Sequence, residues 1–293
     1  MQCKVIFLLV FCPIIAFSQK NAKGIEDVHY ECSWNVKFVD DTVKMTQGIE
    51  DRIILQIGDN LSYQYSYVKQ QSDSVDASIS PFNTNQVLNY VENKINELRN
   101  GNIREGAFVC CFRNIKLYKD YTAKKIKVLH SFYNSWFTYE ESLITQNWEI
   151  LDDTTTIAGY FCQKAVCDFR GRSYEAWFAP EIPICEGPWM LYGLPGLIFR
   201  LNDIQHHYEF DLEEFKSVNN SIDTNVLTTN KMGSGNRTVL LTKVERKEFL
   251  RTAFGKEANR RMSAQIEEAM AKVGLPMQTP KIRHFDYIDM DYK

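Results

Sequence analysis

Cysteines and histidines are the side chains of this chain that most directly suggest chemistry. A catalytic thiol needs a neighbouring histidine or helix N-terminus that lowers its pKa, and none of the five histidines stands in a motif typical of cysteine proteases. An oxidising compartment would instead favour disulfide bonds. Two of the eight cysteines lie in the apolar N-terminal stretch. The other six are the candidate disulfide cysteines: Cys32, Cys110, Cys111, Cys162, Cys167 and Cys185.

Strand geometry excludes some pairings among these six. Cys162 and Cys167 lie five residues apart on one predicted strand, which separates them by ~16 Å, beyond the ~7 Å limit for a disulfide. Cys110 and Cys111 are adjacent and point to opposite faces, so at most one of them can be buried with Cys32. The other pairings stay open, as does the alternative that these thiols are small apolar side chains of the strands.

One short stretch suggests metal binding. On a strand, His207, Glu209 and Asp211 would share one face, and these residue types bind first-row metals. The alternating Tyr208 and Phe210 would then face the core, which leaves the three polar residues on an ordinary solvent-exposed face. We therefore predict neither a metal nor a cofactor.

The familiar enzyme motifs are missing from the sequence: there is no HExxH, GxSxG, P-loop or GxGxxG pattern. An enzyme whose site is assembled from scattered residues stays possible, because catalytic triads are recognised by geometry and not by order. Three aspartates near the end, Asp286, Asp289 and Asp291, lack the glycine and closing glutamate of a calcium loop. We expect them to form a solvated tail.

Residues 1–18 resemble a secretory signal peptide, with Lys4, an apolar run and small residues before a cleavage site after Ser18. Phe11 before Cys12 disfavours a lipid anchor. No later run is long enough for a membrane helix. The chain is predicted to be exported, periplasmic or extracellular, and not an integral membrane protein. Its formal net charge of −3 gives no footprint for nucleic acid.

The elements that must position any site are mostly strands. Residues 28–38 alternate apolar and polar side chains, and 52–57 and 61–67 form a hairpin around Gly58-Asp59-Asn60. Helices are predicted at 83–100 and 243–273, each followed by a glycine, and a polar loop at 217–237. Further strands are predicted at 107–118, 126–132, 135–139, 147–151, 157–169, 173–178, 197–201 and 207–215.

This order predicts an α+β fold: a curved, mostly antiparallel sheet, half-open and barrel-like, with about two helices packed on it. No linker or repeat divides the chain, so residues 19–293 are predicted to form a single domain, with a turn at Gly171-Arg172.

The segment 174–203 contains a corner rich in proline and glycine. Its apolar, turn-forming residues supply no acid, base or nucleophile, so a structural role is favoured over a binding surface. Pro195-Gly196 fits a type II turn, and Trp189 and Leu194 would fill the core beside it. The residues of this structural signature are Gly187, Pro188, Trp189, Gly193, Leu194, Pro195, Gly196, Leu197 and Ile198.

The hexapeptide Gly193–Ile198 and its surroundings resemble the GLPGLI family of exported bacterial proteins, which has no assigned activity. The similarity is best over 159–215, the signature core, where Gly159-Tyr160, Glu175–Phe178 and Gly187–Trp189 match in order. The order of elements also resembles the LolA-like lipoprotein carriers, at the level of the fold alone.

These observations favour a non-enzymatic binding or accessory protein of the cell envelope that holds an apolar ligand, a lipid or a partner segment. The partners implied are a lipid, a peptide or an outer-membrane protein. Two alternatives remain. One is a secreted hydrolase with a site of scattered residues, and the other is a structural partner of an outer-membrane complex.

Overall fold

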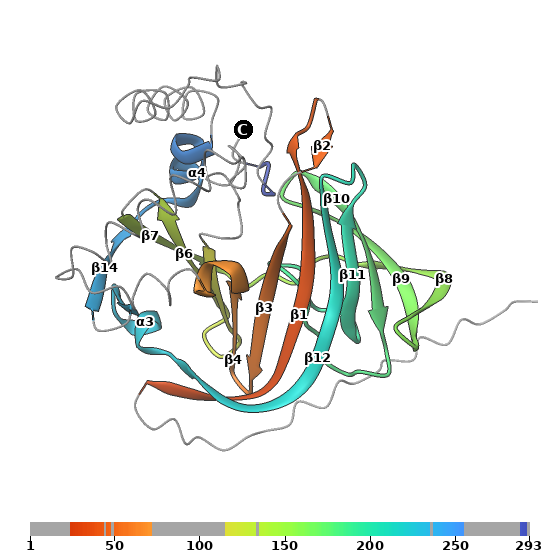
Figure 1. The fold of residues 1–293 in the computed structure, drawn as a ribbon, viewed down its shortest axis with the longest axis horizontal. Coiled ribbons are helices and arrows are strands. Elements are labelled where there is room, and N and C mark those ends of the chain that lie inside the picture. The colour runs from red at the N-terminus through yellow and green to blue at the C-terminus, as the bar shows by residue number, and fades with distance from the viewer. Residues whose placement is uncertain are drawn as a thin grey trace, which may run out of the picture.

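The computed structural model shows one large curved sheet with short helices at its margins (Figure 1). It describes residues 24–43, 45–47, 50–71, 115–132, 135–234, 237–254 and 288–291. The described strands form a 14-stranded sheet in the order β13-β14-β7-β6-β5-β4-β3-β1-β12-β11-β10-β9-β8, with β2 paired to β1. All the pairings are antiparallel except that of β14 with β7. The predicted α+β fold with a curved, mostly antiparallel sheet is confirmed at this level.

The strands begin and end as follows: β1 (Ile25–Asp41), β2 (Thr46–Gln47), β3 (Asp51–Gly58), β4 (Leu61–Ser66), β5 (Ile115–Asp120), β6 (Lys125–Phe132), β7 (Ser135–Ser142), β8 (Glu149–Ile157), β9 (Tyr160–Phe169), β10 (Arg172–Ala179), β11 (Leu197–Asp203), β12 (Tyr208–Asp223), β13 (Lys231–Ser234) and β14 (Arg237–Lys243). Within the described residues, the bounded helices are α3 (Asn225–Thr228) and α4 (Arg246–Phe254), and residues 67–71 are also helical.

Two long central strands give the sheet its curvature. β1 and β12 pair along most of their length and bend together around the lower side of the molecule (Figure 1). Their register shifts twice, between Val28 and Tyr30 and between Ser33 and Trp34. Such bulges bend a strand and increase its twist. The bend places the two halves of the sheet around a shared inner face.

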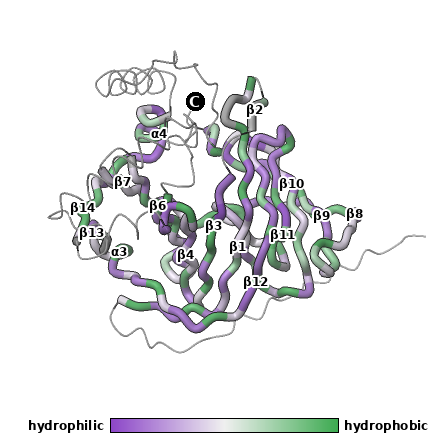
Figure 2. Tube along the Cα trace, in the orientation of Figure 1, coloured by the Kyte–Doolittle hydropathy of each residue, from purple (hydrophilic) through white to green (hydrophobic). Residues whose placement is uncertain are grey.

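The alternation of β1 explains which face is inside. Cys32, Trp34 and Val36 are fully buried in the main core cluster, whereas Glu31 and Asn35 are only partly covered. The alternation of hydropathy is visible along the central strands (Figure 2). Trp34 also donates its indole N–H to the carbonyl of Ile198, 3.1 Å away. The inner face of the sheet is therefore tied directly to the strand that follows the corner.

The hairpins of the right-hand half close with two-residue turns. Ala158 and Gly159 both have positive φ (51° and 85°), as do Arg170 and Gly171 (49° and 81°). Positive φ at both central residues is typical of the type I′ turns that join tightly paired strands. The predicted turn at Gly171-Arg172 is thus shifted by one residue, and the predicted strand 157–169 begins after a turn that we missed.

A second correction concerns residues 217–237, which were predicted to be a loop. β12 continues to Asp223, and α3, β13 and the start of β14 follow. Ile222, Val226 and Met232 are buried in a second, smaller apolar cluster. The predicted helix 83–100 lies outside the described residues. Of the predicted helix 243–273, the described part is helical only over α4. Among the described residues, no helix is long and apolar enough to cross a membrane.

Candidate functional site

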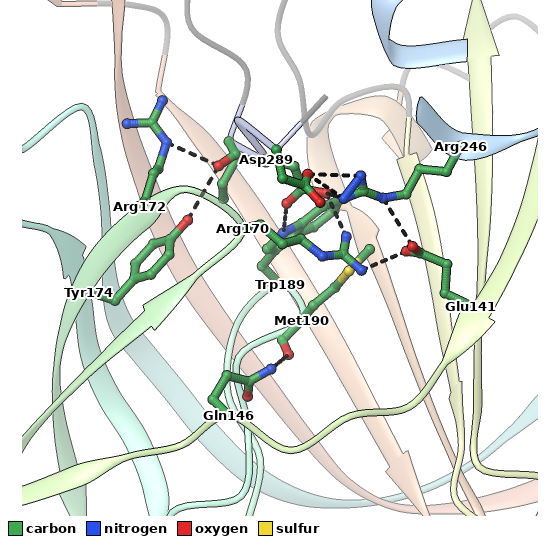
Figure 3. A network of polar contacts seen from close by, with 11 residues as sticks. Glu141, Gln146, Arg170, Arg172, Tyr174, Trp189, Met190, Arg246 and Asp289 are labelled. Atoms are coloured by element: carbon green, nitrogen blue, oxygen red, sulfur yellow. Dashed lines mark hydrogen bonds and ion pairs between the residues drawn. The ribbon is translucent and has the colours of Figure 1, made fainter. Parts of the chain in front are cut away.

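The candidate site lies where the corner, residues 180–196, meets the inner face of the sheet (Figure 3). The corner is held by its own backbone, since the amide of Gly193 donates to the carbonyl of Cys185 at 2.9 Å. The Gln146 side chain fastens it from outside, donating to the carbonyl of Met190 at 3.1 Å and accepting from the amide of Tyr192 at 3.0 Å. A primary amide that replaces backbone partners in this way keeps the corner in one position.

The central carboxylate is Asp289, from the segment Ile288–Asp291. Its side chain is fully buried. One oxygen lies 2.6 Å from a guanidinium nitrogen of Arg170, and the other accepts the indole N–H of Trp189 at 3.1 Å. Arg246, at the first turn of α4, lies 3.8 Å away. A buried carboxylate is tolerated only with such partners, because an unpaired buried charge is costly.

Glu141, at the end of β7, joins the same two arginines from the other side. Its carboxylate is 2.6 Å from Arg170 and 3.2 Å from Arg246, and its side chain keeps 29% of its surface exposed. Arg246 also donates to Asp291 at 2.9 Å. We call these five residues, Glu141, Arg170, Arg246, Asp289 and Asp291, the rim cluster. It combines a dry interior with two carboxylates that reach solvent.

Arg172, across the hairpin turn from Arg170, forms a neighbouring buried group. It donates to the Asp203 carboxylate at 2.9 Å and to the carbonyl of Ile288 at 3.0 Å. Nδ1 of His207 lies 3.2 Å from the same guanidinium. Asp203 also accepts the amide N–H of Tyr208 at 2.8 Å. The turn between β11 and β12 thereby fixes the arginine that holds the C-terminal segment.

Burial and neighbouring charge oppose each other in the pKa of Arg170 and act together in the pKa values of two tyrosines. Burial lowers the pKa of Arg170, but the carboxylates of Asp289 and Glu141 outweigh it, so the pKa is raised above its usual range. Burial raises the pKa of Tyr139 and of Tyr174, and the charge of Asp289 raises both further. The arginine is therefore a permanent cation and both phenols stay neutral at physiological pH.

A second polar group lies beneath the corner and is almost dry. Lys119 and Glu186 form an ion pair at 2.6 Å, with 1% and 5% of their side chains exposed. Ser62 donates to the other Glu186 oxygen at 3.3 Å and accepts from the hydroxyl of Tyr121 at 2.9 Å. Burial raises the pKa of the nearby Cys32 thiol, and the charge of Glu186 adds to this. We call Lys119, Glu186, Ser62 and Cys32 the floor cluster.

The two clusters differ in the chemistry that they can support. A thiol with a raised pKa is a poor nucleophile, and the floor cluster is closed to solvent. The rim cluster presents a carboxylate that can accept a proton or a hydrogen bond, next to two guanidinium groups that can stabilise negative charge. The rim cluster is therefore the better candidate for a functional site.

A scan against family models gives the decisive comparison. The model described as N-glycanase peptide, N-terminal domain, matches residues 66–232, more than half of the chain. The chain belongs to this family.

Two solved structures resemble this member of the N-glycanase N-terminal domain family. Both are titled as structures of PNGF-II, in different space groups. They share 12% identity with the chain and cover 76% of it, with TM-scores of 0.46 and 0.47. The chain spans about a third of their length, 32% and 33%. No protein in the search of curated proteins matches it.

The resemblance to the GLPGLI family is therefore wrong, and so is the fold-level resemblance to LolA-like carriers. The N-glycanase domain model covers all of the segment 159–215 on which the first resemblance rested. Letters such as Gly-Leu-Pro-Gly-Leu-Ile describe an apolar corner, which unrelated folds also need. The family favours the hydrolase alternative over a non-enzymatic carrier of apolar ligands.

In this chain, the signature residues lie in the corner and in the first part of β11. Trp189 and Leu194 are buried, and Gly193 and Gly196 have φ of 93° and 158°. At Gly196 a Cβ atom would lie 2.3 Å from the carbonyl oxygen of Ala179. At Gly187 it would lie 2.6 Å from Ile198 and from the carbonyl of Leu191. The lack of room for a Cβ atom thus explains these glycines as much as the backbone conformation does.

Three of the candidate disulfide cysteines, Cys32, Cys162 and Cys167, are buried free thiols. Cys110 and Cys111 lie outside the described residues, so a disulfide among the remaining cysteines stays a prediction.

The predicted polar strand face of His207, Glu209 and Asp211 is wrong in one part. His207 is buried against Arg172, whereas His206 and Glu209 form an exposed pair at 2.8 Å. Asp211 contacts Arg200 at 2.6 Å. Among the described residues, no group of metal-binding side chains is gathered.

The sequence interpretation missed the rim cluster altogether. Asp289 and Asp291 were predicted to be part of a solvated tail, yet Asp289 is fully buried. Arg172 was seen only as a turn residue, and Arg170 was not singled out at all. The available signal was the Arg-Gly-Arg triplet, in which two arginines flank a glycine turn and so project near each other.

Proposed function

We propose that this chain acts in the hydrolytic processing of N-linked glycans. The observation that carries the proposal is its membership of the N-glycanase N-terminal domain family, whose model extends from Ser66 to Met232. That range includes Glu141, Arg170 and Trp189 of the candidate site. Export would bring the chain to substrates outside the cell.

We propose that Glu141 is the residue that meets the substrate. Its exposed surface and its position between Arg170 and Arg246 support this role, because the guanidinium groups orient the carboxylate. An oriented carboxylate can accept a proton from a water molecule or a hydrogen bond from a sugar hydroxyl. The buried Asp289 supplies Arg170 with its second carboxylate partner, besides Glu141.

The test is incubation of the purified full chain with a fluorescent N-glycopeptide, with released glycan and residual peptide measured by mass spectrometry. We expect release by the unchanged chain and a loss of roughly 100-fold or more in the variant Glu141→Gln. Glu140→Gln is the matched control, since Glu140 is its neighbour on β7 and pairs with Lys127 at 3.3 Å on the other face. No release, together with no binding of the glycopeptide in anisotropy, would overturn the proposal.

We also propose that the chain is exported and that its curved sheet forms a single domain. Cleavage after Ser18, a single domain over 19–293 and a half-open barrel formed by the curved sheet would suit a protein that handles glycoproteins outside the cell. Expression of the full chain with its leader in a bacterial host checks the first point. The N-terminus of the exported product should be Gln19, and a cytoplasmic product that keeps residues 1–18 would contradict it.

A further inference from the structure

The segment Ile288–Asp291 is held by groups that come from distant parts of the chain. Asp289 contacts Arg170 and Trp189, and Asp291 contacts Arg246. The backbone takes part as well. The carbonyl of Ile288 accepts from Arg172 at 3.0 Å and from Tyr174 at 3.4 Å, and the amide of Met290 donates to the carbonyl of Arg170 at 2.8 Å. Ile288 itself is fully buried.

These receptor groups have supports that do not depend on the segment. Arg170 and Arg246 share Glu141, and Arg172 keeps Asp203. The guanidinium groups would therefore stay in position without the segment, which is the condition for a preorganised binding site.

The charges of the receptor call for an acidic occupant. Among the described residues outside the segment, two carboxylates, those of Glu141 and Asp203, pair with the three guanidinium groups. The segment supplies two further carboxylates, separated by one residue, and the first of them also receives the indole N–H of Trp189. Charge-assisted bonds of this kind are shorter and stronger than neutral ones.

We infer that Arg170, Arg172, Arg246 and Trp189 form a binding site for acidic peptide segments of the type Ile-Asp-x-Asp, and that Ile288–Asp291 of this chain is the ligand that now occupies it. An external segment of the same pattern competes for the site. The family match ends at Met232, so Arg246 and the segment are features of this chain beyond the matched region. The inference does not depend on the proposed glycan chemistry.

The main test uses a fluorescent peptide of residues 284–293, added to the full chain and followed by anisotropy. In the double variant Asp289→Asn/Asp291→Asn, the internal ligand is weakened and the site becomes available. We expect the peptide to bind this variant at least about tenfold more tightly than it binds the unchanged chain, because apparent affinity scales with the fraction of open sites. The control variant Asp211→Asn changes an exposed aspartate of β12 that pairs with Arg200, and it should bind the peptide like the unchanged chain.

The control peptide carries asparagine at the positions of Asp289 and Asp291 and should not bind. If the folded double variant binds both peptides equally, or neither, the inference is wrong.

A second measurement uses the unchanged chain, in case the double variant fails to fold. Hydrogen exchange is followed in the C-terminal fragment of the chain, which the label on the added peptide distinguishes by mass. An excess of the acidic peptide should accelerate exchange at Met290, whose amide is bonded to Arg170. Exchange that is unchanged by the acidic peptide, or accelerated equally by the control peptide, would overturn the inference.

Discussion

The rim and floor clusters hold similar charges in different surroundings. In the floor cluster, Lys119 has Glu186 as its ion-pair partner, and both side chains are almost completely buried. In the rim cluster, each arginine contacts two or more carboxylates, and Glu141 is partly exposed. Removing one member of a single buried ion pair leaves the other charge buried without a counter-ion. In a shared network, another charged group can still neutralise the remaining one. The difference indicates that the floor cluster maintains the fold and that the rim cluster can change partners.

The largest effect should come from breaking the floor pair. Lys119→Met leaves Glu186 buried without its cation, and we expect a loss of about 3–5 kcal/mol in the free energy of unfolding. Adding Glu186→Leu should restore much of that loss, because no charge then remains buried. Urea melts of the single and double variants measure both. Lys164→Met, from a more exposed pair with Glu175 at 2.7 Å, is the control and should cost less than about 1 kcal/mol.

The corner, which carries Glu186 of the floor cluster and the Trp189 that contacts Asp289, should be nearly as sensitive. Gly196→Val places a Cβ atom 2.3 Å from the carbonyl oxygen of Ala179, at a φ of 158°. We expect a loss of about 1–3 kcal/mol and a low yield of folded protein. Thermal unfolding checks this. Gly159→Ala, where nothing lies within 4 Å of the added atom, isolates the cost of positive φ from that of steric conflict.

A pH titration tests whether the inner face of the sheet is dry. Burial lowers the pKa of His130 from 6.5 to about 3. Between these values the unfolded chain binds a proton that the folded chain does not, so stability falls as the pH falls. From pH 6.5 to 5 the loss should be about 1.7 kcal/mol, because the slope is half of 1.4 kcal/mol per unit at pH 6.5 and approaches its full value below it. His130→Phe should flatten this part of the profile in urea melts. If the slope of stability against pH is the same in His130→Phe as in the unchanged chain, the His130 ring is hydrated in the folded protein.

The smallest effect should follow a change in the rim cluster. Asp289→Asn keeps the shape of the side chain, and Glu141 still neutralises Arg170. We expect a loss of about 1–2 kcal/mol, the usual cost of weakening a charged hydrogen bond. Chemical denaturation measures it, with Asp211→Asn as the exposed control. A loss as large as that of Lys119→Met would contradict the comparison, because it would show that the network does not compensate.

Much of the sheet was predictable because its signal is local. The alternation over 28–38 identified β1, and the Gly58–Asn60 turn placed β3 beside β4. The end of β12 was missed because its last residues are mostly polar and exposed, so no period of two appears. The turn at Arg170-Gly171 was displaced by one residue because either placement puts the glycine in the turn.

The candidate site could not be predicted in the same way. Arg170 and Asp289 are 119 residues apart, and their contact depends on how two distant segments dock. The final aspartates were interpreted as solvated because the tail is rich in charged residues. Charge alone is a poor guide to exposure when a distant arginine can pair with the carboxylate in the interior. The resemblance to the GLPGLI family failed for a related reason, since turn-forming letters identify a corner and not a family. The resemblance to LolA-like carriers rested on the order of elements alone, which does not identify a function.

The most direct test of the central claim is a hydrogen-exchange footprint of an N-glycopeptide on the full chain. If the rim cluster engages the substrate, exchange should slow in β7 around Glu141 and at the start of α4 around Arg246. It should stay unchanged in β4, which carries Ser62 of the floor cluster, and the variant Glu141→Gln should lose the protection. Protection confined to other strands, or none at saturating glycopeptide, would contradict the assignment of the rim cluster as the functional site.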